Sequence, residues 1–484
     1  MEKLFEKKYI QCIAVTLAVM IVYILRELLR FDVTIKPIMA AAAAYAAFSV
    51  IGCGTQKQMK SDKAIKAVIF AGIVMRIGYM LYTPCNVRSH DLYGLTTQSG
   101  GHAAYLIQLI QNGSLPQSND VQFYQQPFFY LVGSVFSRLI NAVLPDTDVF
   151  MLVDAAKTVS CAASCMILLI AEPLCDAFKL KDREKLAAML IAAFQPAFFL
   201  SIRITPDILC TFFMTLALLY TFKWYEEPDL KNTLILAFVY GFGMMTKISA
   251  AVPALFTAIA FASKLIQRIK EKNAKPLILK LSLFGLISLP LGLWYSVRNH
   301  IRFGQAPWYV LRLTGGENNE LYIGNHSVPE RFVIPDIKSI IRSPYADLKS
   351  EYNFFVYSVK TSLFGEFSYN VPKAVPTVLF ITALILSAAA VIATVYALIH
   401  FREDKKTAAL SALCVLFLGS AISFVINYPH ICSMDFRYST FLIIPFAILL
   451  AKLSSGCKKA FAGNALYICT MIFSLSSCLM YIII

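Results

Sequence analysis

Carboxylates, imidazoles and cations of this chain stand close to the ends of long apolar segments, with the exception of His102. These residues are His90, Asp91, His102, Arg203, Asp207, Lys247, Arg298, Arg302, Asp435 and Arg437. A carboxylate can activate a hydroxyl group or hold a metal ion, whereas Arg and Lys bind phosphate or diphosphate. A site with both suits an enzyme that breaks a bond to phosphate. For each residue alone, the alternative is an interfacial charge that snorkels to the membrane surface.

The elements that carry these residues are predicted from composition. Of 484 residues, 58% are hydrophobic and 15% are charged, and the mean hydropathy is +0.64. Soluble domains have about 25% charged residues, and a membrane-spanning helix needs about 20 mostly apolar residues. We therefore predict an all-α polytopic membrane protein with about 13 transmembrane helices. The expected spans are 9–29, 37–54, 64–83, 150–175, 186–202, 208–224, 233–247, 249–266, 276–296, 374–399, 407–427, 439–453 and 461–484.

Orientation follows from the clustering of Lys and Arg between alternate apolar segments. The formal net charge of +15 is concentrated in loops of the kind that stay in the cytoplasm, and this argues against a nucleic-acid partner. The N-terminus is then cytoplasmic, and the ionisable residues described above gather on the outer side. Two large outer segments remain, at 84–149 and 297–373, and residues 103–111 of the first predict a short amphipathic helix on the membrane surface.

The same pattern predicts the domain organisation. Residues 1–63 form two N-terminal transmembrane helices, which the resemblance described below implies are an addition to the core. Residues 64–296 form the core and include the outer segment 84–149. An outer region at 297–373 and C-terminal transmembrane helices at 374–484 complete the chain.

Short sequence stretches on the outer side together resemble a known set of motifs. RSHDLYGLTTQSGGHAAY at 88–105 is followed by NGSLP at 112–116 and QFYQQPFFYL at 122–131. The later stretches are RITPDILCTF at 203–212, GFGMMTKISA at 241–250, WYSVRNHIRFGQ at 294–305 and DFRYSTFLIIP at 435–445. In this order, from about residue 64 onward, they resemble the GT-C glycosyltransferases of the protein O-mannosyltransferase and lipid A aminoarabinose transferase type, including bacterial members.

The resemblance implies a reaction and its setting. The donor would be a sugar linked to a polyprenyl phosphate in the bilayer of the plasma membrane. An acceptor hydroxyl would attack the anomeric carbon with inversion on the extracytoplasmic side, and the lipid phosphate would leave. A protein, a lipid and a cell-envelope glycan all fit as acceptor. One departure from the motifs is Gln125 and Gln126 before Pro127, because Gln is a poor metal ligand and no base; a role in shaping the loop is the safer interpretation.

The resemblance also implies roles for individual residues. Asp91 follows the third span and is the expected catalytic base, with capping of the surface helix as its alternative. The expected supporting residues are His90, His102, Tyr105, Tyr124 and Pro127. The donor phosphate is expected to bind Lys247, Arg203, Arg298 and Arg437, while Asp207 and Asp435 start helices or pair with these cations. The sequence specifies no cofactor with certainty, and Asp91 and His102 could hold a divalent cation, Mg or Mn.

Composition and topology alone also allow a multi-span transporter or a flippase for envelope precursors. Transporters often show repeated halves and ionisable groups near the bilayer midplane. Here the charged groups stand at outer span ends and no repeat is visible, which favours the enzyme. An enzyme like the O-antigen ligases shares the many spans and the large outer loop, but not these motifs.

Overall fold

The computed structural model describes residues 2–29, 35–53, 59–96, 100–145, 147–313, 315–333, 340, 351–456 and 460–484. Within this part of the chain the regular structure is helical, and ten helices are long and apolar enough to cross a membrane. Three shorter apolar helices accompany them, at Phe128–Val143, Leu230–Thr246 and Thr440–Ser454. The prediction of an all-α polytopic membrane protein is therefore confirmed. Parts of the expected outer region 297–373, and residue 54 of an expected span, lie outside the described residues.

Contacts between residues divide the chain into two compact units. Unit 1 comprises Met1–Phe31, Thr83–Ile170 and Ile202–Leu311, and unit 2 comprises Asp32–Tyr82, Ala171–Ser201 and Arg312–Ile484. The elements of unit 1 are α1 (Glu2–Leu29), α4 (His102–Asn112), η1 (Val121–Tyr124), α5 (Phe128–Val143), α6 (Val149–Ala155), most of α7 (Lys157–Ala177), α10 (Asp207–Glu226), α11 (Leu230–Thr246), η2 (Ile248–Ala251), α12 (Ala254–Lys270) and α13 (Lys275–Phe303).

Unit 2 holds the remaining helices. They are α2 (Ile35–Cys53), α3 (Met59–Tyr82), α8 (Asp182–Phe194), α9 (Ala197–Leu200), η3 (Gly316–Asn318), α14 (Val328–Phe332), α16 (Phe354–Phe364), α17 (Ala374–Ile399), α18 (Lys405–Asn427), η4 (Ile431–Met434), η5 (Phe436–Tyr438), η6 (Thr440–Leu442), α19 (Ile443–Gly456) and α20 (Ala460–Ile483).

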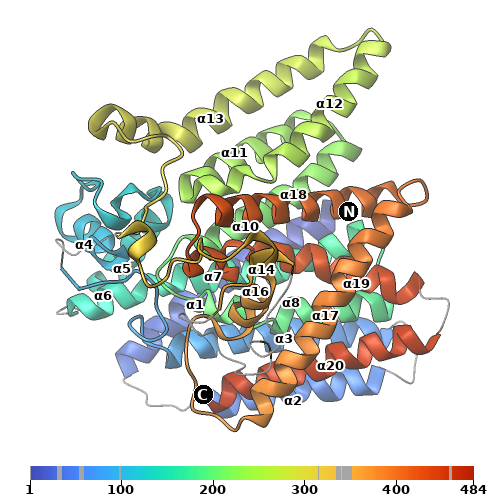
Figure 1. Cartoon of the computed structure of the whole chain (residues 1–484), viewed down its shortest axis with the longest axis horizontal. Helices are drawn as coiled ribbons and strands as arrows, with labels where there is room; N and C mark the ends of the chain where they lie inside the picture. The colour runs from blue at the N-terminus through green and yellow to red at the C-terminus, as the bar shows by residue number, and fades with distance from the viewer. Residues whose placement is uncertain are drawn as a thin grey trace. The chain divides into compact units, whose positions relative to one another are not determined.

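In unit 1, α10, α11 and α13 pack as neighbours (Figure 1). The chain turns from α10 into α11 at Asp229, whose carboxylate accepts the Asn232 N–H at 2.7 Å and so caps α11. Trp224 is fully buried beside this turn, and its indole N–H donates to Thr233 Oγ1 at 2.8 Å. Burial of its large apolar ring fixes the two helices against each other.

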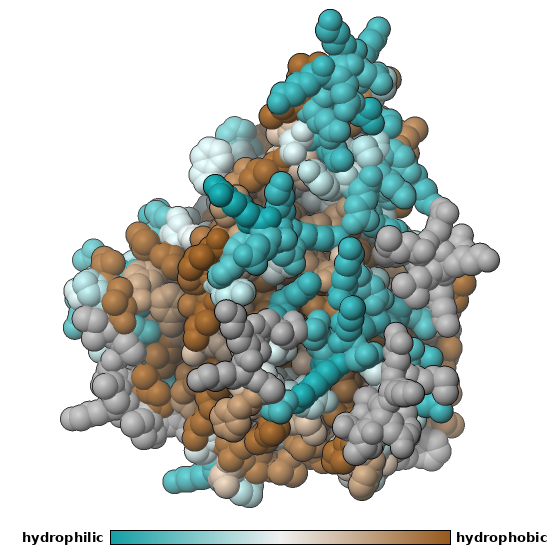
Figure 2. All heavy atoms as spheres, turned by 90° about the vertical axis from the view of Figure 1, so that its right-hand side faces the viewer, coloured by the Kyte–Doolittle hydropathy of each residue, from teal (hydrophilic) through white to brown (hydrophobic). Residues whose placement is uncertain are grey.

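Hydrophilic residues gather where α12 turns into α13, between residues 268 and 275. Figure 2 shows this turn as a hydrophilic tip at the top of the molecule, while apolar side chains lie elsewhere on the same face. Apolar residues that remain exposed on spanning helices, such as Leu279 and Leu286 of α13, are each 72% exposed. In a membrane protein such side chains face lipid.

In unit 2, the expected span 186–202 is divided into α8 and α9. The break falls at Gln195, which is extended (φ −65°, ψ 121°) because the residue before a proline is disfavoured in helical conformation. The buried Arg76 of α3 compensates by donating to the carbonyls of Ala193 at 2.7 Å and Ala192 at 2.8 Å. The Ser477 hydroxyl donates to the Phe194 carbonyl at 2.5 Å. Backbone groups freed at a break inside a membrane need such partners.

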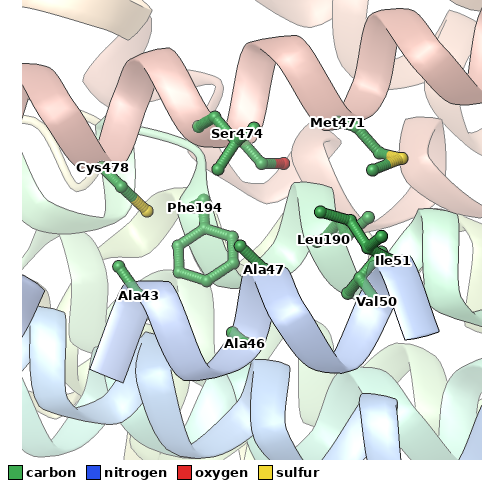
Figure 3. Close-up of a pocket in the computed structure, with 11 residues that line it drawn as sticks. Ala43, Ala46, Ala47, Val50, Ile51, Leu190, Phe194, Met471, Ser474 and Cys478 are labelled. Carbon is green, nitrogen blue, oxygen red and sulfur yellow. The ribbon is translucent and has the colours of Figure 1, made fainter. Parts of the chain in front are cut away.

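An apolar pocket lies between α2, α8 and α20 of the same unit. The small side chains of Ala43, Ala46 and Ala47 form one wall, and Phe194 and Cys478 contribute to the others (Figure 3). Because its lining is almost wholly apolar and carries no charged residue, this pocket offers no carboxylate for acid–base catalysis and no cation for binding phosphate. The candidate site must be sought elsewhere.

Candidate active site

Asp91 is held beside the start of α4 by its backbone. Its carbonyl accepts the His102 N–H at 3.0 Å, and the Leu92 carbonyl accepts the Ala103 N–H at 3.4 Å. The first N–H groups of a helix have no partner within the helix, so this segment caps α4 through main-chain oxygens. Asp91 itself is half-buried and has a positive φ of 52°.

Gly101 makes this close approach of two backbones sterically feasible. A Cβ atom at this position would lie 2.3 Å from the Leu92 carbonyl oxygen, which is closer than side-chain carbons come to backbone atoms. The predicted amphipathic helix at 103–111 is observed as α4, and its N-terminus is the point where Asp91 and His102 meet.

His102 is buried and belongs to an aromatic stack. Its Nδ1 lies 2.5 Å from the Tyr130 hydroxyl, and the Tyr105 and Tyr130 rings stack with centroids 3.9 Å apart. Burial raises the pKa of Tyr130 well above its usual value, and the charges of Asp207 and Asp91 add to this effect. Asp207 and Asp91, more than a hundred residues apart in sequence, thus both contribute to the raised pKa of this buried hydroxyl group.

The Gln-Gln-Pro turn connects η1 to α5 and is tied to α13. The Gln126 side-chain amide donates to Ser296 Oγ at 2.8 Å, and the Tyr295 hydroxyl donates to the Phe123 carbonyl at 2.8 Å. The buried Pro127 is the N-cap residue of α5. Half-buried Tyr124 receives a hydrogen bond on its hydroxyl from the Gln125 amide at 3.0 Å. These contacts hold the turn in one shape.

The Lys247 ammonium group forms an ion pair with Asp207, with Nζ 2.5 Å from Oδ1. Asp207 is the first residue of α10, and Lys247 stands in extended conformation where α11 gives way to η2. The Asp207 side chain is 8% exposed and the Lys247 side chain is 21% exposed. Lys247 thus interrupts the apolar run 233–266. The ion pair connects the N-terminal end of α10 to the C-terminal end of α11.

Two further cations of unit 1 occupy different surroundings. Arg203 is buried in the turn before α10, where its carbonyl accepts the Ser160 hydroxyl at 2.6 Å. Arg298 of α13 is half-buried and donates to the Pro116 carbonyl at 2.6 Å. Its guanidinium group also lies over the Tyr295 ring, 5.0 Å from the centroid, and so joins α13 to the segment after α4.

The other predicted residues are placed as follows. In unit 2, Arg437 Nε lies 3.5 Å from Asp435 Oδ2, and the Asp435 carboxylate also accepts the Arg437 backbone N–H at 3.0 Å. Both residues lie at the short η5 helix. His90, adjacent to Asp91 in unit 1, is half-buried.

Reasoning from the sequence missed the part played by Tyr130 and Tyr295. Both residues are within the stretches that carry the resemblance, at 122–131 and 294–305, but a tyrosine in an apolar run gives no sign of what its hydroxyl will contact. Only the packing of α4 and α5 reveals that the Tyr130 hydroxyl meets His102. The role of Tyr295 is shown by the hydrogen bond from its hydroxyl to the Phe123 carbonyl, just before the Gln-Gln-Pro turn.

The residues expected to hold a divalent cation supply few ligand atoms. Tyr130 engages Nδ1 of His102, so the imidazole can supply no more than one ring nitrogen, and Asp91 adds one carboxylate. Mg and Mn are usually bound by several oxygen ligands. Asp91 and His102 fit such an ion only if phosphate oxygens or water complete its shell.

Comparison with known proteins agrees with this picture for the central part of the chain. A family model described as dolichyl-phosphate-mannose-protein mannosyltransferase matches residues 135–294, about one third of the chain. The matched region contains Arg203, Asp207 and Lys247, whereas Asp91 and Arg437 lie outside it. No curated protein sequence matches the chain. Because this family is a member of the GT-C superfamily, the resemblance predicted from the motifs is confirmed: residues 135–294 of this polytopic membrane protein are similar to GT-C glycosyltransferases.

Proposed function

We propose that this protein transfers a sugar from a polyprenyl-phosphate donor to an acceptor hydroxyl on the extracytoplasmic side of the plasma membrane, with inversion at the anomeric carbon. The observation that carries the proposal is the grouping, in one compact unit, of Asp91, the Asp207–Lys247 pair and the aromatic stack around Tyr130. The family match to residues 135–294 supports a membrane glycosyltransferase that uses such a donor.

Asp91 is the proposed general base. It takes the proton of the acceptor hydroxyl as the acceptor oxygen bonds to the anomeric carbon from the face opposite the phosphate. The bond between the anomeric carbon and the phosphate oxygen breaks, and the polyprenyl phosphate leaves with the bonding electrons. His102, through Tyr130, and Tyr105 support the fold of the segment that presents Asp91.

The proposed phosphate-binding cations of unit 1 are Lys247, Arg203 and Arg298, and Arg437 of unit 2 is a further candidate. An ammonium group has three N–H donors, so the bond from Lys247 to Asp207 is compatible with a second bond to a phosphate oxygen. Positive charge held in place before the reaction stabilises the departing phosphate without reorganisation. Arg437 is included on its match to the motif at 435–445 and on its position beside Asp435.

The competing proposal is a transporter or flippase, and the broken span α8–α9 is the observation that would favour it. Transporters use the exposed backbone groups of such breaks to bind ions or substrates. In this chain Arg76 and Ser477 already donate to the carbonyls of residues 192–194, so the break is satisfied by protein groups. This favours the enzyme.

The test is transfer of a labelled sugar from a polyprenyl-phosphate donor, assayed in membranes that contain the protein. Asp91→Asn should lose nearly all transfer, because an amide cannot accept the proton; loss of one general base costs about 100- to 10,000-fold. Asp120→Asn is the matched control, since Asp120 is an exposed carboxylate of the same outer segment. Full activity of Asp91→Asn would refute the assignment of the base. No transfer with any such donor, together with measurable flux of a solute, would favour the transporter.

A further inference from the structure

A second group of polar side chains in unit 1 is buried away from the residues discussed so far. Asp154 of α6 and Lys157 at the start of α7 form an ion pair with Lys157 Nζ 2.7 Å from Asp154 Oδ1. Their side chains are only 5% and 1% exposed. Burying two charges costs several kcal/mol of desolvation energy per ion. Ionisable groups inside a membrane protein are a functional hypothesis by default.

Both members of this pair bind the backbone of the segment that leads to Asp91. The Asp154 carboxylate accepts the Cys85 N–H at 2.7 Å, and the Lys157 ammonium donates to the Thr83 carbonyl at 2.5 Å. Thr83 and Cys85 are the first residues after α3, and Asp91 follows Cys85 by six positions. The chain between them then reaches the contact with α4. The segment is thus fixed at both ends, by the buried pair and by the N-terminus of α4.

The N-terminal helix α1 contributes the third member of the group. The Tyr23 hydroxyl donates to Asp154 Oδ2 at 2.9 Å, and Tyr23 is fully buried. The buried residues Val15, Val19 and Tyr23 follow one another at intervals of four and form one face of α1. The polar end of that face is therefore Tyr23, and its hydroxyl meets the second oxygen of the carboxylate that holds Cys85.

We propose that Tyr23, Asp154 and Lys157 are positioning residues for the proposed base Asp91. In the transferase, α1 holds this group in place through the hydrogen bond from Tyr23 to Asp154. The inference rests on the proposed function. Asp154 uses one oxygen for Lys157 and Cys85 and the other for Tyr23, so its charge is matched by three donors. Loss of any donor lets the segment 83–91 shift. A displacement of about 1 Å caused by a residue remote from the reacting atoms can lower a rate about 100-fold.

The activity test compares kcat and KM in the membrane transfer assay for Asp154→Asn and Tyr23→Phe. We expect kcat to fall by about 100-fold in Asp154→Asn and by a smaller factor in Tyr23→Phe, with KM for the donor unchanged because the cations stay in place. Tyr9→Phe is the matched control on α1, since Tyr9 is 43% exposed. Asp148→Asn is the matched control on α6, because Asp148 caps that helix at Met151 N without contacting the segment before Asp91.

Action through Asp91 is tested by combining variants. If Asp154 acts by placing the base, then Asp154→Asn should slow an Asp91→Asn protein no further, because residues that act as a unit are not additive. An equal loss of kcat in both backgrounds would show a general structural role and would overturn the inference. If Asp91→Asn alone is fully active, the proposed function loses its base, and this failure is seen before the combined variant is made.

Cys85 provides a readout that does not depend on transfer. The thiol is buried, and burial, followed by the charge of Asp154, raises its pKa to about 12. We therefore expect slow labelling by a maleimide at neutral pH, because the thiolate is the reactive form. Asp154→Asn and Tyr23→Phe should speed labelling of the peptide that contains Cys85, measured by mass spectrometry, whereas Tyr9→Phe should not. Unchanged labelling in Tyr23→Phe would overturn the inference, and this mild variant answers the question even if Asp154→Asn does not fold.

Discussion

The ion pair between Lys247 and Asp207 allows structural and catalytic roles to be separated. We consider Lys247→Met, Asp207→Asn and the double variant. Removing one partner of a buried ion pair costs about 3–5 kcal/mol, because the remaining charge stays buried without its partner. Since the Lys247 side chain is 21% exposed and water can screen it, we expect the lower end of this range, about 3 kcal/mol. Thermal midpoints of domains with 150–250 residues shift by about 2–4 °C per kcal/mol, so each single variant should melt about 6–12 °C lower.

The double variant should regain much of this stability, because it leaves neither charge buried. Coupling energies of about 0.5–3 kcal/mol are usual for residues in contact, and the cycle is measured by melting the purified protein in detergent. Lys270→Met is the control, since Lys270 is exposed at the end of α12.

Transfer activity should behave differently from stability in the same cycle. If Lys247 binds the donor phosphate, the double variant should melt close to the wild type and still fail to transfer sugar, with a raised KM for the donor or a lowered kcat. Recovery of both stability and activity in the double variant would refute the reasoning, because Lys247 would then serve only to neutralise Asp207. Additive losses of stability would contradict the ion pair itself.

Three further predictions concern the supports of the site and of the fold. Arg76→Leu leaves two backbone carbonyls at the α8–α9 break without their donors, at a cost of about 1–3 kcal/mol for each group; a melting point equal to the wild type would contradict this role. Gly101→Ala should abolish transfer while the protein still folds, because a Cβ atom meets a carbonyl oxygen at 2.3 Å; Gly285→Ala, where nothing lies within 4 Å, should be fully active. Burial raises the pKa of Tyr130, so the unfolded chain loses this proton first as pH rises through about 10, and stability should fall there. Tyr130→Phe should melt with a shallower dependence on alkaline pH, and an unchanged slope would contradict the shift.

The sequence by itself determined the fold class and much of the catalogue of candidate residues. Runs of about 20 apolar residues have one stable solution in a bilayer, the helix, because every backbone group must be satisfied within the segment. A short helix at 103–111 was predictable from its amphipathic pattern and is observed as α4. The interruption at Lys247 was also visible, because a lysine between apolar runs ends a hydrophobic segment.

Only the tertiary structure decided which partners these residues meet. Asp207 forms an ion pair with Lys247, forty residues away, a pairing that the sequence did not indicate. The span 186–202 was predicted as continuous although it contains Pro196, and only the structure shows that Arg76 of α3 donates to the carbonyls at its break. Asp154 and Lys157 stand three residues apart in one expected span, but nothing in the sequence indicates that Tyr23, more than a hundred residues away, meets them. Hydrophobicity is a property of a local window, whereas ion pairs and buried hydrogen bonds are set by side chains that packing brings together from distant parts of the chain.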